Sequence, residues 1–134
     1  WAPDIIHCQG WISHLLPVYL KKAYKDDPIF SSSKIVLSLY DDTPKEPFSG
    51  KFVQKIPFGG VTTEDVKFLS EPTGINLAKT AVQFSDGIIM GSGNVDKEIV
   101  DFCKESNLPV LPFNGKSLEN GSYIDEYNAF YDKL

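Results

Sequence analysis

Short apolar runs alternate along this chain with segments of helical periodicity. The apolar runs occupy 4–8, 34–40, 87–91 and 108–112, and each of them predicts a β-strand. In the segments between and after them, apolar residues recur at i, i+3, i+4 and i+7, which predicts helices over 12–23, 73–84, 94–103 and 122–134. Strands that alternate with helices are typical of an α/β fold with a parallel sheet, here of about four strands, and right-handed crossovers.

The first predicted helix contains a proline and a histidine that affect its expected shape and its expected exposed face. Pro17 removes one helical hydrogen bond, so we expect it to bend the helix over 12–23. His14 falls on the polar face of the same periodic pattern, so we expect its side chain to be solvated. The apolar face is expected to consist of Ile12, Leu15, Leu16, Tyr19, Leu20 and Ala23.

Capping residues and turn formers delimit the other elements. Residues 43–61 are rich in proline and glycine and predict a long excursion with one helical turn near 50–55. Thr62 and Asp65 have the spacing of a capping box for a short helix that ends near Ser70. Asn94 is expected to cap the helix that follows it. The buried face of the last helix is expected to carry Ile124, Tyr127, Tyr131 and Leu134.

The charge distribution narrows the classes of partner. The net charge is −5, and every one of the 13 basic residues is lysine. Nucleic-acid binding depends on basic residues that neutralise phosphates, so we expect no nucleic-acid partner. No apolar run approaches the ~20 residues that span a bilayer, so we also expect no membrane partner.

The two cysteines, Cys8 and Cys103, fall within predicted apolar faces. Buried thiols that lack a Cys/His metal-binding pattern are typical of reduced cytoplasmic proteins. We therefore expect a cytoplasmic location, no metal site and no cofactor.

The ends of the predicted strands carry the residues that can bind a ligand or take part in catalysis. In an open α/β sheet, ligands bind outside the carboxyl ends of the strands, where His7, Gln9 and Trp11 are expected. A histidine there can hold a substrate hydroxyl or transfer a proton, and a core histidine bonded to its surroundings is the alternative. Trp11 can stack on a sugar or pack in the core. Asp41 and Asp42 can bind a divalent ion or form a solvated turn.

The two remaining strand-end features carry weaker signals. Asp86 has the position of a residue that ends a helix rather than that of a catalyst. The run 91–94, Gly-Ser-Gly-Asn, joins a strand to a helix but lacks both the phosphate-loop lysine and the dinucleotide-binding glycines.

The order of these segments resembles the glycogen (starch) synthase family. Residues 3–11, Pro-Asp-Ile-Ile-His-Cys-Gln-Gly-Trp, are similar to the family's Pro-Asp-hydrophobic-hydrophobic-His-x-His-Asp-Trp, and Leu15-Leu16-Pro17-Val18-Tyr19-Leu20 to its following helix. Asn76 and Lys79 match its Asn-x-x-Lys, and 85–92 its Ala-Asp-x-hydrophobic-hydrophobic-x-Val-Ser. The likeness covers residues 2 to about 100 and is closest to short bacterial members.

The resemblance implies a fold and an activity. It implies a Rossmann-like parallel sheet with helices on both faces, within the carboxyl half of the amino-terminal domain of a GT-B glycosyltransferase. Residues 1–134 would then be one α/β domain or a fragment incomplete at its amino end. The implied reaction is retaining transfer of glucose from ADP-glucose or UDP-glucose to the 4-hydroxyl of an α-1,4-glucan. His7, Gln9, Trp11, Asn76 and Lys79 are the implied substrate-binding residues, and no catalytic residue is assigned.

The chain departs from the family pattern at several positions. Gln9 stands in place of the second histidine, which contacts the donor sugar, and Gly10 in place of the aspartate. Tyr40 and Asp41 replace His-Asn, and Gly93 replaces a proline. The residues that handle the diphosphate in the second domain, an arginine among them, are absent, so we expect this chain to be inactive alone.

Two other functions remain open. A non-catalytic glucan-binding or assembly module on the same half-fold fits the lost histidine and arginine. A flavodoxin-like or receiver-like domain that uses Asp41 and Asp42 ranks below both, because the downstream Thr/Ser and Lys pattern is missing. The first strand would leave an open sheet edge, which a homo-oligomer could cover.

Overall fold

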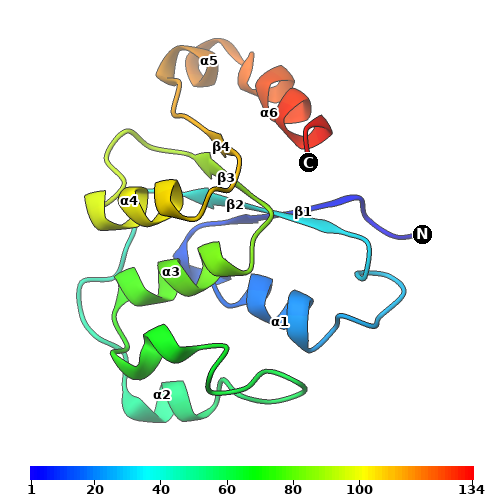
Figure 1. Ribbon diagram of the computed structural model, residues 1–134. Coiled ribbons are helices and arrows are strands. Elements are labelled where there is room, and N and C mark those ends of the chain that lie inside the picture. Colours follow the sequence, from blue (N-terminus) through cyan, green and yellow to red (C-terminus); the bar gives the residue numbers. More distant parts are fainter.

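The computed structural model describes residues 1–134 and contains one sheet of four parallel strands (Figure 1). The strands lie in chain order: β1 (Ile5–Gln9), β2 (Lys34–Leu39), β3 (Gly87–Met90) and β4 (Val110–Leu111). All three pairings are parallel, as the alternation of strands and helices predicts.

Six α-helices and two short 3₁₀ helices surround the sheet. None of the helices is long and apolar enough to cross a membrane. The α-helices are α1 (Leu16–Lys22), α2 (Gly50–Gln54), α3 (Gly74–Gln83), α4 (Lys97–Glu105), α5 (Gly115–Asn120) and α6 (Tyr123–Asp132), and the 3₁₀ helices are η1 (Trp11–Ser13) and η2 (Lys67–Ser70).

Helices cover both faces of the sheet, as expected. On the first face, α1, α3 and α4 bury alternate strand residues such as Cys8, Leu37 and Ile88 in the main core. On the second face, α6 packs Phe130 against Val36 and Ile89. Figure 1 shows α1 and α3 on one side of the strands and α6 on the other. The α/β fold with a Rossmann-like parallel sheet is therefore confirmed.

Helix α3 forms where its local sequence predicts it. The hydroxyl of Thr73 accepts a hydrogen bond from the Asn76 amide at 3.1 Å, which caps the amino end. The apolar residues at positions 77, 78, 81 and 82 have the spacing that predicts this helix, and all four are buried in the core. The predicted helical turn in the long excursion is also present, as α2. Thr62 and Asp65 cap each other's backbone as predicted, although the helix behind them is the 3₁₀ segment η2.

The predicted first helix is wrong in its beginning and in its exposed face. Residues 11–13 form a 3₁₀ helix, and α1 starts only at Leu16, so Pro17 lies in its first turn, where it needs no hydrogen-bond partner. Because the helix is interrupted between Ser13 and Leu16, Ile12 is 83 % exposed and His14 only 3 % exposed. Both are the reverse of what one continuous helix predicts.

Three further expectations are corrected by tertiary packing. Asp96, not Asn94, caps α4, through a bond from the Glu98 amide at 2.9 Å. Ile124 is 55 % exposed, and Phe130 takes the buried position on α6. The short helix α5 was not expected from the sequence.

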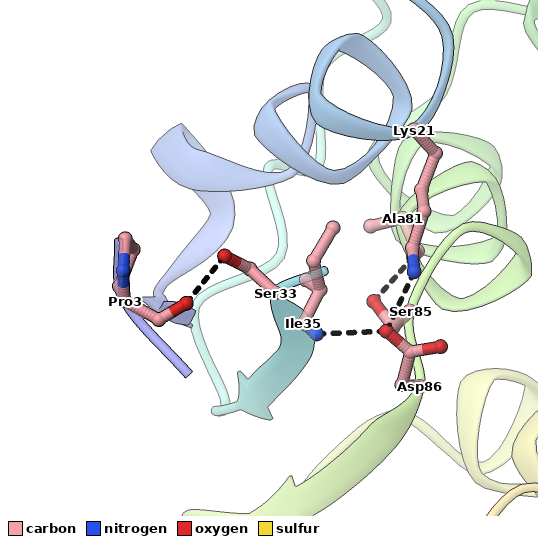
Figure 2. A network of polar contacts seen from close by, with 7 residues as sticks. All are labelled: Pro3, Lys21, Ser33, Ile35, Ala81, Ser85 and Asp86. Atoms are coloured by element: carbon pink, nitrogen blue, oxygen red, sulfur yellow. Dashed lines mark hydrogen bonds and ion pairs between the residues drawn. The ribbon is translucent and has the colours of Figure 1, made fainter. Parts of the chain in front are cut away.

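Asp86 ties three elements together at the amino ends of β2 and β3 (Figure 2). Its Oδ2 accepts hydrogen bonds from the Lys21 Nζ at 2.7 Å and from the Ile35 amide at 2.8 Å. The Asp86 amide in turn donates to the Ile35 carbonyl at 2.8 Å. Asp86 is thus a structural residue at the amino ends of the strands. Ligands in such folds bind at the other ends of the strands, the carboxyl ends.

Candidate functional site

The strand-end residues meet at the carboxyl edge of the sheet. Gln9 ends β1, Asp41 and Asp42 follow β2, and Ser92 follows β3. Because the strands are parallel neighbours, these ends share one edge, which is where ligands bind in open α/β sheets.

A polar cavity of about 520 Å³ opens at this edge. It lies between the loop after β2, the amino end of α3 and the segment that leads into α4. Only one of its twelve lining residues is hydrophobic. The charged lining consists of Asp41, Lys45, Glu71, Asp96 and Glu98, so carboxylates outnumber lysines and a phosphate group meets an unfavourable field there.

Asn76 lines this cavity, and Lys79 lies one helical turn further along α3. The Asn76 Nδ2 donates to the Glu71 carbonyl at 2.8 Å, which leaves its Oδ1 available as an acceptor. The Lys79 Nζ pairs with the Glu98 carboxylate at 2.9 Å and lies 5.7 Å from the centre of the Phe102 ring. The side chain of Lys79 is only 17 % exposed, so water solvates its ammonium group little and Glu98 is its main charged partner.

Gln9 and Trp11 lie at the end of β1, next to Asp42. The Gln9 side chain is exposed and makes no hydrogen bond within the chain. The Trp11 amide donates to the Asp42 Oδ2 at 3.0 Å, and the Trp11 ring stacks on Phe48 with centroids 6.0 Å apart. Trp11 therefore joins the β1 end to the long excursion after β2.

His7 faces the second side of the sheet, under α6. Its Nε2 lies 2.5 Å from the Ser38 Oγ, and its Nδ1 lies 2.8 Å from the Tyr131 hydroxyl. Burial lowers the pKa of the His7 imidazole, which favours the neutral ring. In this arrangement both ring nitrogens have partners within the chain.

His14 is a buried polar residue that the sequence pattern placed in solvent. Its Nδ1 has no hydrogen-bond partner. Burial lowers the pKa of His14 to about 4, although the negative charge of Asp42 acts in the opposite direction. No sequence signal marks this burial, because it follows from the break between η1 and α1.

The two thiols are free and buried. Burial raises the pKa of Cys8 and of Cys103 to about 11, so neither side chain provides a thiolate near neutral pH. No group of three or more His, Cys, Asp or Glu side chains is arranged to hold a metal ion.

Residues 1–109 match the starch synthase catalytic domain family. This chain belongs to that family. It is 30 % identical to the glycogen synthase of Clostridium perfringens over 141 residues, which cover 100 % of this chain and 29 % of that protein. It is 33 % identical to the glycogen synthase of Thermotoga maritima over 137 residues, and 29 % identical to glycogen synthase 2 of Geobacter sulfurreducens over 139 residues.

The matches cover nearly all of this chain and a small part of each relative. The two latter alignments span 98 % and 99 % of this chain, and each spans 28 % of the relative. The chain thus spans less than a third of the length of the curated relatives it matches. No solved structure matches the chain significantly. The family resemblance read from the four ordered motifs is confirmed.

Proposed function

We propose that this chain forms part of a retaining glucosyltransferase that moves glucose from ADP-glucose or UDP-glucose to the 4-hydroxyl of an α-1,4-glucan. Membership of the starch synthase family supports the class of reaction. In this proposal the chain is the carboxyl half of a GT-B amino-terminal domain, and the cytoplasm, suggested by its free buried thiols, is its location.

The observation that carries the proposal is the polar cavity beside Asn76. A cavity of about 520 Å³ has room for a small saccharide, and its carboxylate and amide groups can hydrogen-bond sugar hydroxyls. The excess of carboxylates disfavours a diphosphate in the same space. We therefore assign a glucosyl or glucan segment to the cavity and leave the nucleotide to groups outside this chain.

The proposed substrate-binding residues differ in whether their side chains already have partners within the chain. Gln9 has a free side-chain amide and Asn76 has a free acceptor oxygen, so both can bind hydroxyls as they stand. Trp11 has one ring face against Phe48. His7 must exchange its bond to Tyr131, and Lys79 must leave Glu98, before either can contact a substrate.

The isolated chain is proposed to be inactive in glucosyl transfer. The transition state of this reaction places charge on the donor phosphate, which needs cationic support. All basic residues of the chain are lysines, and Lys45 is the one lysine in the cavity wall. The chain can therefore hold hydroxyl groups in the cavity but provides only one lysine there to stabilise the leaving group.

A non-catalytic glucan-binding or assembly module is the second candidate. The specific observation in its favour is that two of the proposed binding side chains already have partners within the chain: Lys79 pairs with Glu98, and His7 is bonded through both ring nitrogens. The β1 strand pairs on one side only, so a homo-oligomer that covers its open edge is part of this proposal.

One pair of measurements tests both candidates. The 134-residue chain is incubated with ADP-[¹⁴C]glucose and glycogen, and maltoheptaose is titrated into it by calorimetry. We expect no label in glycogen and a measurable heat of maltoheptaose binding. Incorporated label would contradict the proposed inactivity, and an absence of heat with maltoheptaose would contradict both candidates.

A further inference from the structure

The carboxylate of Asp42 connects two strand ends beyond the limit of the sheet. The β1–β2 ladder ends at the pair Gln9 and Ser38. Past that pair, the Asp42 Oδ2 accepts the hydrogen bond of the Trp11 amide at 3.0 Å. A hydrogen bond that a backbone amide donates to a carboxylate is stronger than one to a neutral acceptor, so this contact can fix the turn that follows β1.

The backbone at Gly10 shows why the carboxylate comes from the segment after β2. Gly10 has φ +80° and ψ 161°, a region that is essentially restricted to glycine. A Cβ atom added there would lie 3.3 Å from the Asp42 Oδ2. Position 10, where the family pattern has aspartate, thus cannot carry an acid in this conformation, and the Asp42 carboxylate lies next to that same space.

The side chain of Trp11 is held by the same segment of the chain. Phe48 lies six residues after Asp42 and stacks on the Trp11 ring at an interplanar angle of 28°. Phe48 in turn contacts Phe52 of α2, with centroids 4.9 Å apart. The backbone and the ring of Trp11 are therefore both located by residues that follow β2.

A buried imidazole also responds to Asp42. His14 lies three residues after Trp11, is 3 % exposed, and has an unpartnered Nδ1. Burial has the larger effect on its pKa and lowers it, whereas the negative charge of Asp42 acts in the opposite direction. The Asp42 carboxylate therefore acts on a second residue of this segment besides Trp11.

We propose that Asp42 is a positioning residue, which holds the Gly10–Trp11 turn so that the Gln9 amide and the Trp11 ring face a glucan at the carboxyl edge of the sheet. This role rests on the proposed function, because it serves Gln9 and Trp11 as substrate-binding residues. Asp42 itself contacts neither the substrate nor the reacting atoms. Its carboxylate lies next to the position that a Cβ atom of residue 10 would take.

Two variants of Asp42 separate its acceptor oxygen from its charge. Asp42→Ala removes the acceptor, whereas Asp42→Asn retains an oxygen that can accept from the Trp11 amide. Asp26→Ala is the matched control, since Asp26 is exposed and has no hydrogen-bond or ion-pair partner. Each protein is studied by amide hydrogen exchange followed by NMR and by calorimetric titration with maltoheptaose.

We expect Asp42→Ala to speed exchange of the Trp11 amide about tenfold and to weaken maltoheptaose binding about tenfold, which is the scale of a lost bond to a charged group. The Leu37 amide in the ladder should keep its protection, which separates the local change from general unfolding. Asp42→Asn should remain within about threefold of wild type in both measurements, and Asp26→Ala should match wild type.

Each other outcome has a definite meaning. Unchanged Trp11 exchange in Asp42→Ala overturns the positioning role. Faster Trp11 exchange with unchanged maltoheptaose affinity overturns its importance for binding, and so does a failure of Asp42→Asn to restore affinity. A wild-type protein that binds no maltoheptaose overturns the proposed function, while the Trp11 exchange still decides whether Asp42 holds the turn.

Discussion

The hydroxyl of Tyr131 lies 2.8 Å from the Nδ1 of His7 and joins the last helix to the first strand. Tyr127 packs edge-on against the same imidazole, with ring centroids 5.8 Å apart. His7, on the second face of the sheet, therefore helps to hold α6 against the sheet.

Tyr131→Phe is expected to destabilise the protein by about 1 kcal/mol, because it leaves a half-buried imidazole nitrogen without its partner. Urea denaturation followed by circular dichroism gives the free energy of unfolding. Tyr24→Phe is the matched control, since the Tyr24 hydroxyl makes no hydrogen bond and the residue is exposed. Equal stability of the two variants would show that the His7 contact contributes nothing.

His14 gives the protein a stability that depends on pH. Its folded pKa of about 4 lies below the ordinary value of 6.5, so the unfolded chain binds more protons between these limits. Its contribution is full above pH 6.5 and is lost as the pH falls toward 4. The slope of the unfolding free energy approaches about 1.4 kcal/mol per pH unit.

Denaturation of the wild type and of His14→Gln from pH 7.5 to pH 5 checks this slope. The variant has no imidazole to titrate at position 14, so its stability should fall less steeply over that range. Parallel curves for the two proteins would contradict a buried neutral His14.

Asp86→Ala is expected to cost about 2 kcal/mol, because the Ile35 amide at the start of β2 loses its acceptor. Lys21→Met should cost less than about 1 kcal/mol, since the side chain of Lys21 is 34 % exposed and solvent screens the pair. Thermal or urea unfolding of both variants measures how much unfolding free energy each substitution removes. A larger loss for Lys21→Met would show that the ion pair, not the backbone bond, stabilises this corner.

Gly91→Ala is expected to destabilise the protein by about 1–3 kcal/mol through overpacking. An added Cβ would overlap the Tyr40 ring, so the ring must move. Gly50→Ala is the control, because nothing lies within 4 Å of its Cβ position and alanine favours the helix. If Gly91→Ala matches Gly50→Ala in urea denaturation, the close approach of Tyr40 is not rigid.

Local signals predicted those elements in which packing agrees with sequence periodicity. The Thr73 cap and the apolar stripe of α3 lie on one continuous helix, so both the element and its buried face followed from spacing. The region from Trp11 to Leu16 did not, because the break between η1 and α1 exchanges the environments of Ile12 and His14. Spacing rules assume one continuous helix and give no sign of such a break.

The candidate site was predictable as a set of strand ends but not as a cavity. Strand order alone predicts Gln9, Trp11 and Asp42 at the carboxyl edge, but none of the three lines the cavity. The carboxylates Glu71 and Glu98 reach the cavity from other elements, and the pairing of Lys79 with Glu98 depends on how α3 and α4 pack. These relationships are tertiary, so no local motif reports them.

We propose that the cavity beside Asn76 binds an α-1,4-glucan. Calorimetric titration of maltoheptaose into the wild type, Asn76→Ala and Asn128→Ala tests this proposal, because Asn128 is exposed on α6 and lies outside the cavity wall. We predict that Asn76→Ala weakens binding about tenfold or more, while Asn128→Ala matches the wild type. Equal affinities for all three proteins, or no binding by the wild type, would contradict the claim.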